Sequence, residues 1–137
     1  MNTDLNKRLN LSLLLLRIGV FIVMALWAVD KFVNPAHTAG VFAKFYMIEG
    51  LSSGISYVLG ALQLALVIAF LVGYKRTISY GLILLMHGVS TFAPFARYFE
   101  PWSNMLFFTA WPMLAAILVL FIMREHDEWT VDAKLKG

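Results

Sequence analysis

Four long stretches of apolar residues constrain this chain more than any other feature of its sequence. They cover residues 11–29, 53–73, 77–95 and 105–123, and the only Lys, Arg, Asp or Glu within them is Arg17. A helix needs about 20 residues to cross a bilayer, and hydrocarbon offers the backbone no partners outside the segment itself. No stretch shows the alternation of barrel strands. We therefore expect an all-α polytopic membrane protein: one domain, residues 1–137, with four transmembrane helices in an antiparallel bundle.

Composition supports the same fold class. Hydrophobic residues make up 61% of the chain and charged residues 14%, whereas about a quarter of an ordinary soluble domain is charged. A water-soluble four-helix bundle is the weaker alternative, because each of its helices would need a polar face. The chain has no cysteine, which excludes disulfides, zinc–thiolate sites and a thiol nucleophile within it.

The distribution of basic residues predicts the orientation. Seven of the 11 border the apolar stretches on one side and three on the other. The first group is Lys7, Arg8, Lys75, Arg76, Arg124, Lys134 and Lys136, and the second is Lys31, Lys44 and Arg97. The positive-inside bias then places both termini in the cytoplasm, across a bacterial-type inner membrane. Because these charges are divided among membrane borders, we expect no nucleic-acid partner. A cleaved signal peptide is the alternative for the N-terminus, but its apolar run is too long and lacks a clean cleavage site.

The connections carry their own signals. In the first loop, residues 30–52, Asn34 followed by Pro35 predicts the start of a short helix. This helix lies either in the outer membrane interface or over the mouth of the bundle as a lid. The short turn at residues 74–76 makes the second and third spans antiparallel neighbours, and Pro112 predicts a kink in the fourth. We expect the charged run 124–128 to be a solvated helix end.

Small residues suggest how the helices pack. Ala61, Ala65, Ala69 and Gly73 recur at every fourth position of the second span and predict a close helix–helix approach. Gln63 lies on the opposite face, which we expect to be turned toward protein as well, because a primary amide in hydrocarbon lacks partners. Gly81 and Gly88 predict another close approach in the third span.

Polar side chains inside the spans are the candidate functional residues. We expect them to converge on an intramembrane pocket that binds a ligand such as a quinone, a sterol-like hydroxyl or a chain of waters. The candidate ligand-binding residues are Arg17, Gln63, Tyr80, His87 and Thr91, with Lys31 as a charge at the outer mouth. Two structural alternatives stay open. Arg17 and Lys31 could extend to the headgroups, and His87 and Gln63 could form a hydrogen bond between the second and third spans.

Metal binding and catalysis have weak support in the sequence. His87 is the only histidine within a span, while His37 and His126 belong to loops. No serine or cysteine triad, phosphate loop or pair of intramembrane carboxylates is visible. We therefore predict no metal site and no catalytic residue, and the sequence leaves enzymatic activity of the isolated chain open while favouring its absence.

Several motifs resemble those of the DoxX-like family. They are the run from Leu14 to Gly19 continuing through Trp27 to Lys31, Gly60–Gln63, Met86–Thr91, Asn104–Phe108 and Trp111–Pro112. The resemblance implies a four-helix inner-membrane protein related to the small membrane subunit of thiosulfate:quinone oxidoreductase. Gln63 occupies the place of a glutamate that is usual in the family, and an amide cannot exchange a proton as a carboxylate does.

Three functions are consistent with these observations. The first is a non-catalytic accessory protein or subunit of a membrane redox or respiratory assembly, offering a pocket of quinone size. The second is a carrier or binder of a small apolar ligand or an ion, and the third is a structural subunit that packs against a larger membrane complex. The expected partners are the lipid bilayer and a larger redox complex or further copies of the chain. The only cofactor expected is a quinone.

Overall fold

The computed structural model describes residues 2–136, and the part of the chain that it describes contains helices and no β-strand. The four longest helices are α1 (Thr3–Val33), α3 (Ser53–Val72), α4 (Arg76–Phe92) and α5 (Ala110–Ile122). The shorter elements are α2 (Pro35–Phe45), α6 (Val131–Lys136) and three 3-10 segments, η1 (Phe95–Phe99), η2 (Met105–Thr109) and η3 (Arg124–His126). The all-α fold class is confirmed.

Three segments are long and apolar enough to cross a membrane. They are α1, α3 and the continuous stretch Met105–Ile122, formed by η2 and α5. The remaining long helix, α4, has 17 residues. These three segments indicate a membrane protein.

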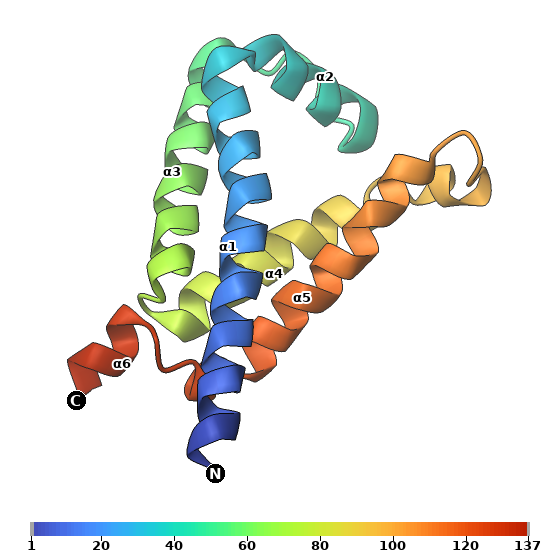
Figure 1. The fold of residues 1–137 in the computed structure, drawn as a ribbon. Helices are drawn as coiled ribbons and strands as arrows, with labels where there is room; N and C mark the ends of the chain where they lie inside the picture. The colour runs from blue at the N-terminus through green and yellow to red at the C-terminus, as the bar shows by residue number, and fades with distance from the viewer. Residues whose placement is uncertain (1, 137) are drawn as a thin grey trace.

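The long helices form two hairpin-like pairs. α1 lies along α3, and α4 lies along α5 (Figure 1). The α4–α5 pair leans away from α1 and α3 toward the end of the bundle that carries α2 (Figure 1). We call this the α2 end and the opposite end, at Arg17, Leu71 and Arg76, the tail end. The buried residues of α5 are Ile117 and Leu120, in its second half, so this helix is most deeply packed toward the tail end.

One face of α1 supplies a continuous strip of the core. Its buried residues recur every three or four positions and run from the tail end to the α2 end. They are Asn10, Leu13, Arg17, Val20, Met24 and Ala28. This spacing follows one side of a helix with 3.6 residues per turn. Leu13, Val20 and Met24 of this strip belong to one hydrophobic cluster, which also contains Val67, Phe70, Tyr80 and Ile83.

The packing face of α3 is the one that carries Gln63. Gln63 and Gly60 are buried, whereas Ala61 and Ala65 are exposed. The prediction that Gln63 faces protein is therefore confirmed, and the prediction that the alanine face makes the close approach is wrong at these two alanines. The close approach occurs at Gly60, where an added Cβ would lie 3.1 Å from the Ala28 carbonyl oxygen.

Two predictions in the second half of the chain need correction. The fourth span begins as the 3-10 segment η2 and becomes α-helical at Ala110. Pro112 thus lies in the first turn of α5, where a missing N–H removes no α-helical hydrogen bond. Gly81 does pack closely, because a Cβ there would lie 3.3 Å from the Phe121 ring, but no atom lies within 4 Å of a Cβ built on Gly88.

Candidate functional site

A buried ion pair lies at the tail end of the bundle. The Arg17 side chain is 1% exposed, and its Nε lies 3.2 Å from Oδ2 of Asp127. The same guanidinium donates to the backbone oxygens of Leu71, at 2.6 Å, and Trp129, at 2.8 Å. A buried charge is tolerated when it is paired and hydrogen-bonded. Arg17 therefore joins α1, the end of α3 and the C-terminal segment, and it does not extend to the surface.

Asp127 is the centre of this cluster. Its carboxylate is fully buried and accepts a hydrogen bond from the Tyr80 hydroxyl at 2.7 Å. Its backbone oxygen accepts hydrogen bonds from Arg76 Nη1, at 2.5 Å, and from the Thr130 hydroxyl, at 2.9 Å. Burial raises the pKa of the Asp127 carboxyl, an effect that the Tyr80 hydrogen bond and the charges of Arg17 and Arg76 oppose.

The position of Asp127 contradicts the prediction that residues 124–128 form a solvated helix end. The chain turns back after η3 and buries both Asp127 and Thr130. Gly73 makes this return possible. It ends α3 with a left-handed φ of 72°, and a Cβ at this position would overlap the Thr130 side chain. The Gly73 backbone oxygen also accepts a hydrogen bond from the Asp132 N–H at 3.1 Å.

The C-terminal segment also caps α4. The Asp132 carboxylate accepts hydrogen bonds from the backbone N–H groups of Lys75 and Arg76, both at 2.8 Å. Lys75 is the N-cap residue of α4 and supplies no side-chain cap of its own, so Asp132 satisfies donors that a helix start leaves free. Partial burial acts to raise the pKa of Asp132, whereas these two hydrogen bonds and the charge of Arg76 act to lower it. Together the lowering effects are larger, so the pKa of Asp132 lies below its ordinary value.

The polar residues nearer the middle of the bundle do not join this cluster. His87 Nε2 lies 2.9 Å from the Ala110 backbone oxygen. A carbonyl only accepts, so this nitrogen carries the proton. Thr91 donates to the His87 carbonyl oxygen within α4 at 2.7 Å. Gln63 is 6% exposed, and its Oε1 has no hydrogen-bond partner among residues 2–136.

The five predicted pocket residues thus fall into separate groups. Arg17 and Tyr80 meet at Asp127, His87 and Thr91 bond to backbone carbonyls, and Gln63 lies by itself in the α1–α3 interface. Two surface grooves, one at Gly88 and one at Gly40, are lined by none of the five.

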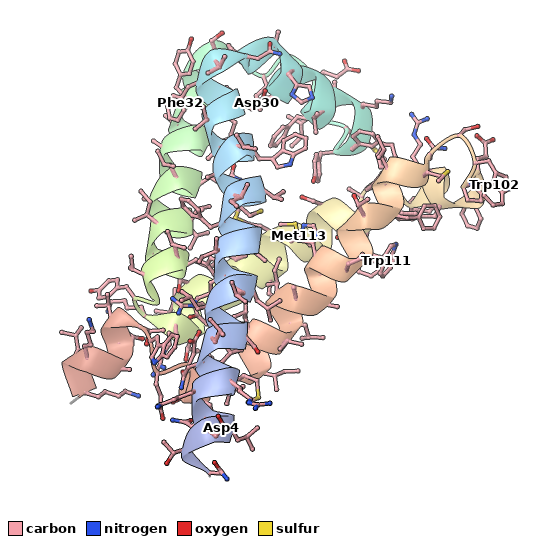
Figure 2. All side chains as sticks on the ribbon, viewed as in Figure 1. Asp4, Asp30, Phe32, Trp102, Trp111 and Met113 are labelled. Carbon is pink, nitrogen blue, oxygen red and sulfur yellow. The ribbon has the colours of Figure 1, made fainter. Side chains whose placement is uncertain are left out.

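Lys31 lies at the α2 end of α1, the end at which Asp30 and Phe32 are labelled and opposite Asp4 (Figure 2). Its Nζ is 3.4 Å from the Trp27 backbone oxygen. The Lys31 carbonyl accepts a hydrogen bond from the Ser56 hydroxyl at 2.8 Å. Lys31 therefore contributes to the α1–α3 contact through its backbone, whereas its ammonium group bonds within α1.

Sequence reasoning missed Asp127, Arg76 and Asp132. One signal could have pointed to the first of them: a buried arginine requires a carboxylate partner. Within the described part of the chain, no group of three or more His, Cys, Asp or Glu side chains could hold a metal ion. The tail-end cluster is therefore organised as an ion pair with hydrogen bonds to the backbone.

Comparison of the chain with protein-family models, with curated proteins and with solved structures found no match. The resemblance to the DoxX-like family accordingly remains a proposal based on the motifs of the sequence.

Proposed function

We propose that this protein spans a bacterial-type inner membrane four times, with both termini in the cytoplasm. Three apolar segments have the required length, and α4 supplies the fourth span. The 17 residues of α4 extend over about 25 Å, slightly less than the hydrocarbon core of about 30 Å, a mismatch that local thinning of the bilayer accommodates. The basic residues near the tail end support a cytoplasmic position for this end.

Within that membrane, we propose a non-catalytic role as an accessory protein or subunit of a redox or respiratory assembly, as the DoxX-like motifs imply. The proposal of a non-catalytic role is based on the pairing of Arg17 with Asp127. The buried guanidinium of Arg17 pairs with the Asp127 carboxylate and donates hydrogen bonds to backbone oxygens. This arrangement favours a structural role for the two charges over a catalytic one.

The α2 end offers a surface for a partner. The connection between α4 and α5 exposes large apolar side chains, including Phe99 at 80%, Trp102 at 87% and Leu106 at 83%. Exposed apolar groups in such a cluster are typical of protein–protein or membrane contacts. The partner is a larger redox complex, and further copies of the chain are the alternative.

Mild detergent extraction from native membranes tests the subunit role. We expect a membrane redox protein to co-purify with the chain in a fixed ratio. The double change Phe99→Ser and Trp102→Ser should release it. The control Trp129→Ser, at the tail end, alters another exposed tryptophan, 48% accessible, and should retain the partner. Purification of the chain alone, or only with copies of itself, would contradict the role.

Binding of a quinone is a second candidate function, favoured by one observation. The Gln63 amide is buried in the α1–α3 interface, and its Oε1 lacks a hydrogen-bond partner within residues 2–136. An unsatisfied amide in a buried site is costly and is expected to find a partner. Because Oε1 accepts, the hydroxyl of a quinol headgroup would supply the missing donor, whereas a quinone carbonyl would accept a hydrogen bond from the amide nitrogen of Gln63.

Quinone extracted with the purified protein tests this candidate. Gln63→Leu should remove co-purifying quinone. Ala61→Leu, on the exposed face of the same helix, is the control and should leave the quinone content unchanged. Equal quinone content in all variants, with folding verified by circular dichroism, would exclude this candidate.

A further inference from the structure

A groove at the α2 end separates α2 from η2. Its volume is about 380 Å³. It is lined by His37, Gly40, Val41, Lys44, Phe45 and Phe107. The rings of Phe45 and Phe107, which both line it, lie 6.0 Å apart. Next to α2, the hydroxyl of Tyr46 lies 3.3 Å from that of Ser90 in α4. In Figure 1 the end of α2 points from the α1–α3 pair toward the α4–α5 pair. The groove therefore lies where the two helix pairs diverge.

The groove combines an apolar floor with one lining cation, Lys44, and a second cation, Arg97, lies near the ring of the lining residue Phe45. Lys44 Nζ lies 5.5 Å from the centroid of the Phe45 ring, and Arg97 Cζ lies 5.9 Å from the same centroid. Within residues 2–136, neither cation has a carboxylate oxygen within 4 Å. His37 differs, because its Nδ1 lies 2.6 Å from Asp30 Oδ2. Lys44 and Arg97 thus present positive charge that the protein itself leaves without a close counterion.

We propose that this groove binds an anionic phospholipid of the outer leaflet. Its phosphate would lie beside Lys44, with the charge of Arg97 nearby, and the upper part of an acyl chain would lie against Val41, Phe45 and Phe107. Charge complementarity selects this occupant: two cations beside an apolar surface favour a ligand with a net negative head and an apolar tail. A zwitterionic phospholipid fits less well because its own cation faces the same two groups. The groove volume is within the range of small-molecule sites.

The inference rests on the proposed membrane position of the chain and goes beyond the proposed function. It is tested on the full-length protein purified in detergent, by native mass spectrometry with dioleoyl phosphatidylglycerol and dioleoyl phosphatidylcholine, which share acyl chains. We expect phosphatidylglycerol to be retained preferentially. The double change Lys44→Gln and Arg97→Gln should reduce this preference about tenfold.

Two further variants separate the groove from general attraction of anions. Gly40 has open space around it, with no atom within 4 Å of an added Cβ. Gly40→Phe therefore fills the groove without changing the charge, and it should also reduce retention of phosphatidylglycerol. The pair Lys7→Gln and Lys134→Gln removes two charges near the tail end and should have little effect.

The proposal would be overturned by equal retention of the two lipids, by an unchanged preference in Gly40→Phe, or by an equal loss in the tail-end control. Oleic acid, an anion without a phosphate, forms a separate arm. If it displaces phosphatidylglycerol at equal concentration, the site selects a fatty acid and the phospholipid proposal fails. A protein that purifies in buffer without detergent would instead refute the membrane position itself.

Discussion

The tail end and the middle of this bundle differ in how far their buried polar side chains are paired. At the tail end, Arg17 and Asp127 pair with each other and are joined by Tyr80 and backbone oxygens. In the middle, His87 reaches one backbone oxygen, and Gln63 keeps an amide oxygen without a partner among the described residues. Polarity within a span therefore does not by itself define a ligand site. The tail end is a structural junction: Arg17 Nε and Asp127 Oδ1 also make no hydrogen bond within residues 2–136, but both side chains are held by their ion pair and by the hydrogen bonds of their other atoms.

The largest effect should follow removal of the Asp127 carboxylate. Asp127→Leu leaves Arg17 buried without a counterion, and breaking a buried pair in this way costs about 3–5 kcal/mol. Unfolding in mixed detergent micelles measures the change in the free energy of unfolding.

The matched control replaces both partners. Arg17→Met combined with Asp127→Leu removes the unpaired charge and should restore much of the lost stability, since apolar replacements of buried pairs are often neutral. If Asp127→Leu alone were as stable as the parent protein, the contrast between the two regions would disappear.

The next effect concerns the return of the C-terminal segment over Gly73. Gly73→Ala forces a non-glycine residue into the left-handed region, and its Cβ overlaps Thr130. We expect a loss of about 1–3 kcal/mol. Thermal unfolding followed by circular dichroism measures it.

Gly88→Ala is the control for Gly73→Ala. Gly88 is helical, and its added Cβ meets no atom within 4 Å. Replacing a helical glycine by alanine in open space gains about 0.5–1 kcal/mol. A loss at Gly88 equal to that at Gly73 would show that the tail contact has no special cost.

A smaller effect is expected in the middle of the bundle. His87→Ala removes the hydrogen bond to Ala110, and such bonds between membrane helices average about 0.6 kcal/mol. Gln63→Leu removes an amide whose oxygen has no partner within residues 2–136 and should leave stability unchanged or raise it. Unfolding in mixed detergent micelles compares His87→Ala, Gln63→Leu and Asp127→Leu directly. If His87→Ala or Gln63→Leu lost more free energy of unfolding than Asp127→Leu, the comparison would be reversed.

The sequence predicted the helical elements better than their contacts, for a physical reason. Apolar length alone marks the helices, and Asn34–Pro35 correctly located the start of α2. A helix that is apolar all round does not indicate which face packs, so Ala61 and Ala65 were assigned to the wrong side. Gln63 was the better guide, because an amide has a strong reason to avoid lipid.

The site was predictable only in part. Arg17 and Tyr80 were singled out because they are polar residues within apolar stretches. Asp127 was missed because it lies in a charged run, where carboxylates are normally exposed to solvent. Its burial depends on the chain turning back beside Gly73, a tertiary feature with no local pattern. The requirement of Arg17 for a counterion would have limited the search to the few acidic residues on the same side of the membrane.

The smallest effect tests the C-terminal segment by pH. Because the pKa of Asp132 is lowered in the folded protein, the ionised carboxylate stabilises the docked segment above the ordinary pKa of about 3.8. This contribution is lost as pH falls from there through the lower folded pKa. Fluorescence of Trp129, with Trp27, Trp102 and Trp111 changed to Phe, should therefore report release of the segment below about pH 3.8.

Asp132→Asn should remove that acid step and weaken docking by about 0.5–1 kcal/mol, less than a hydrogen bond to a fully buried charged group contributes, because the carboxylate is partly exposed. Asp127, whose pKa burial raises, gives a pH dependence of the opposite sign. It is present in both proteins and therefore cancels when the two titrations are subtracted. Glu125→Gln, which changes an exposed carboxylate 3.7 Å from Lys136, is the control and should titrate like the parent. Coinciding curves for the parent and Asp132→Asn below pH 3.8 would mean that the cap on α4 does not hold the segment, and that Arg17 and Asp127 hold the tail end by themselves.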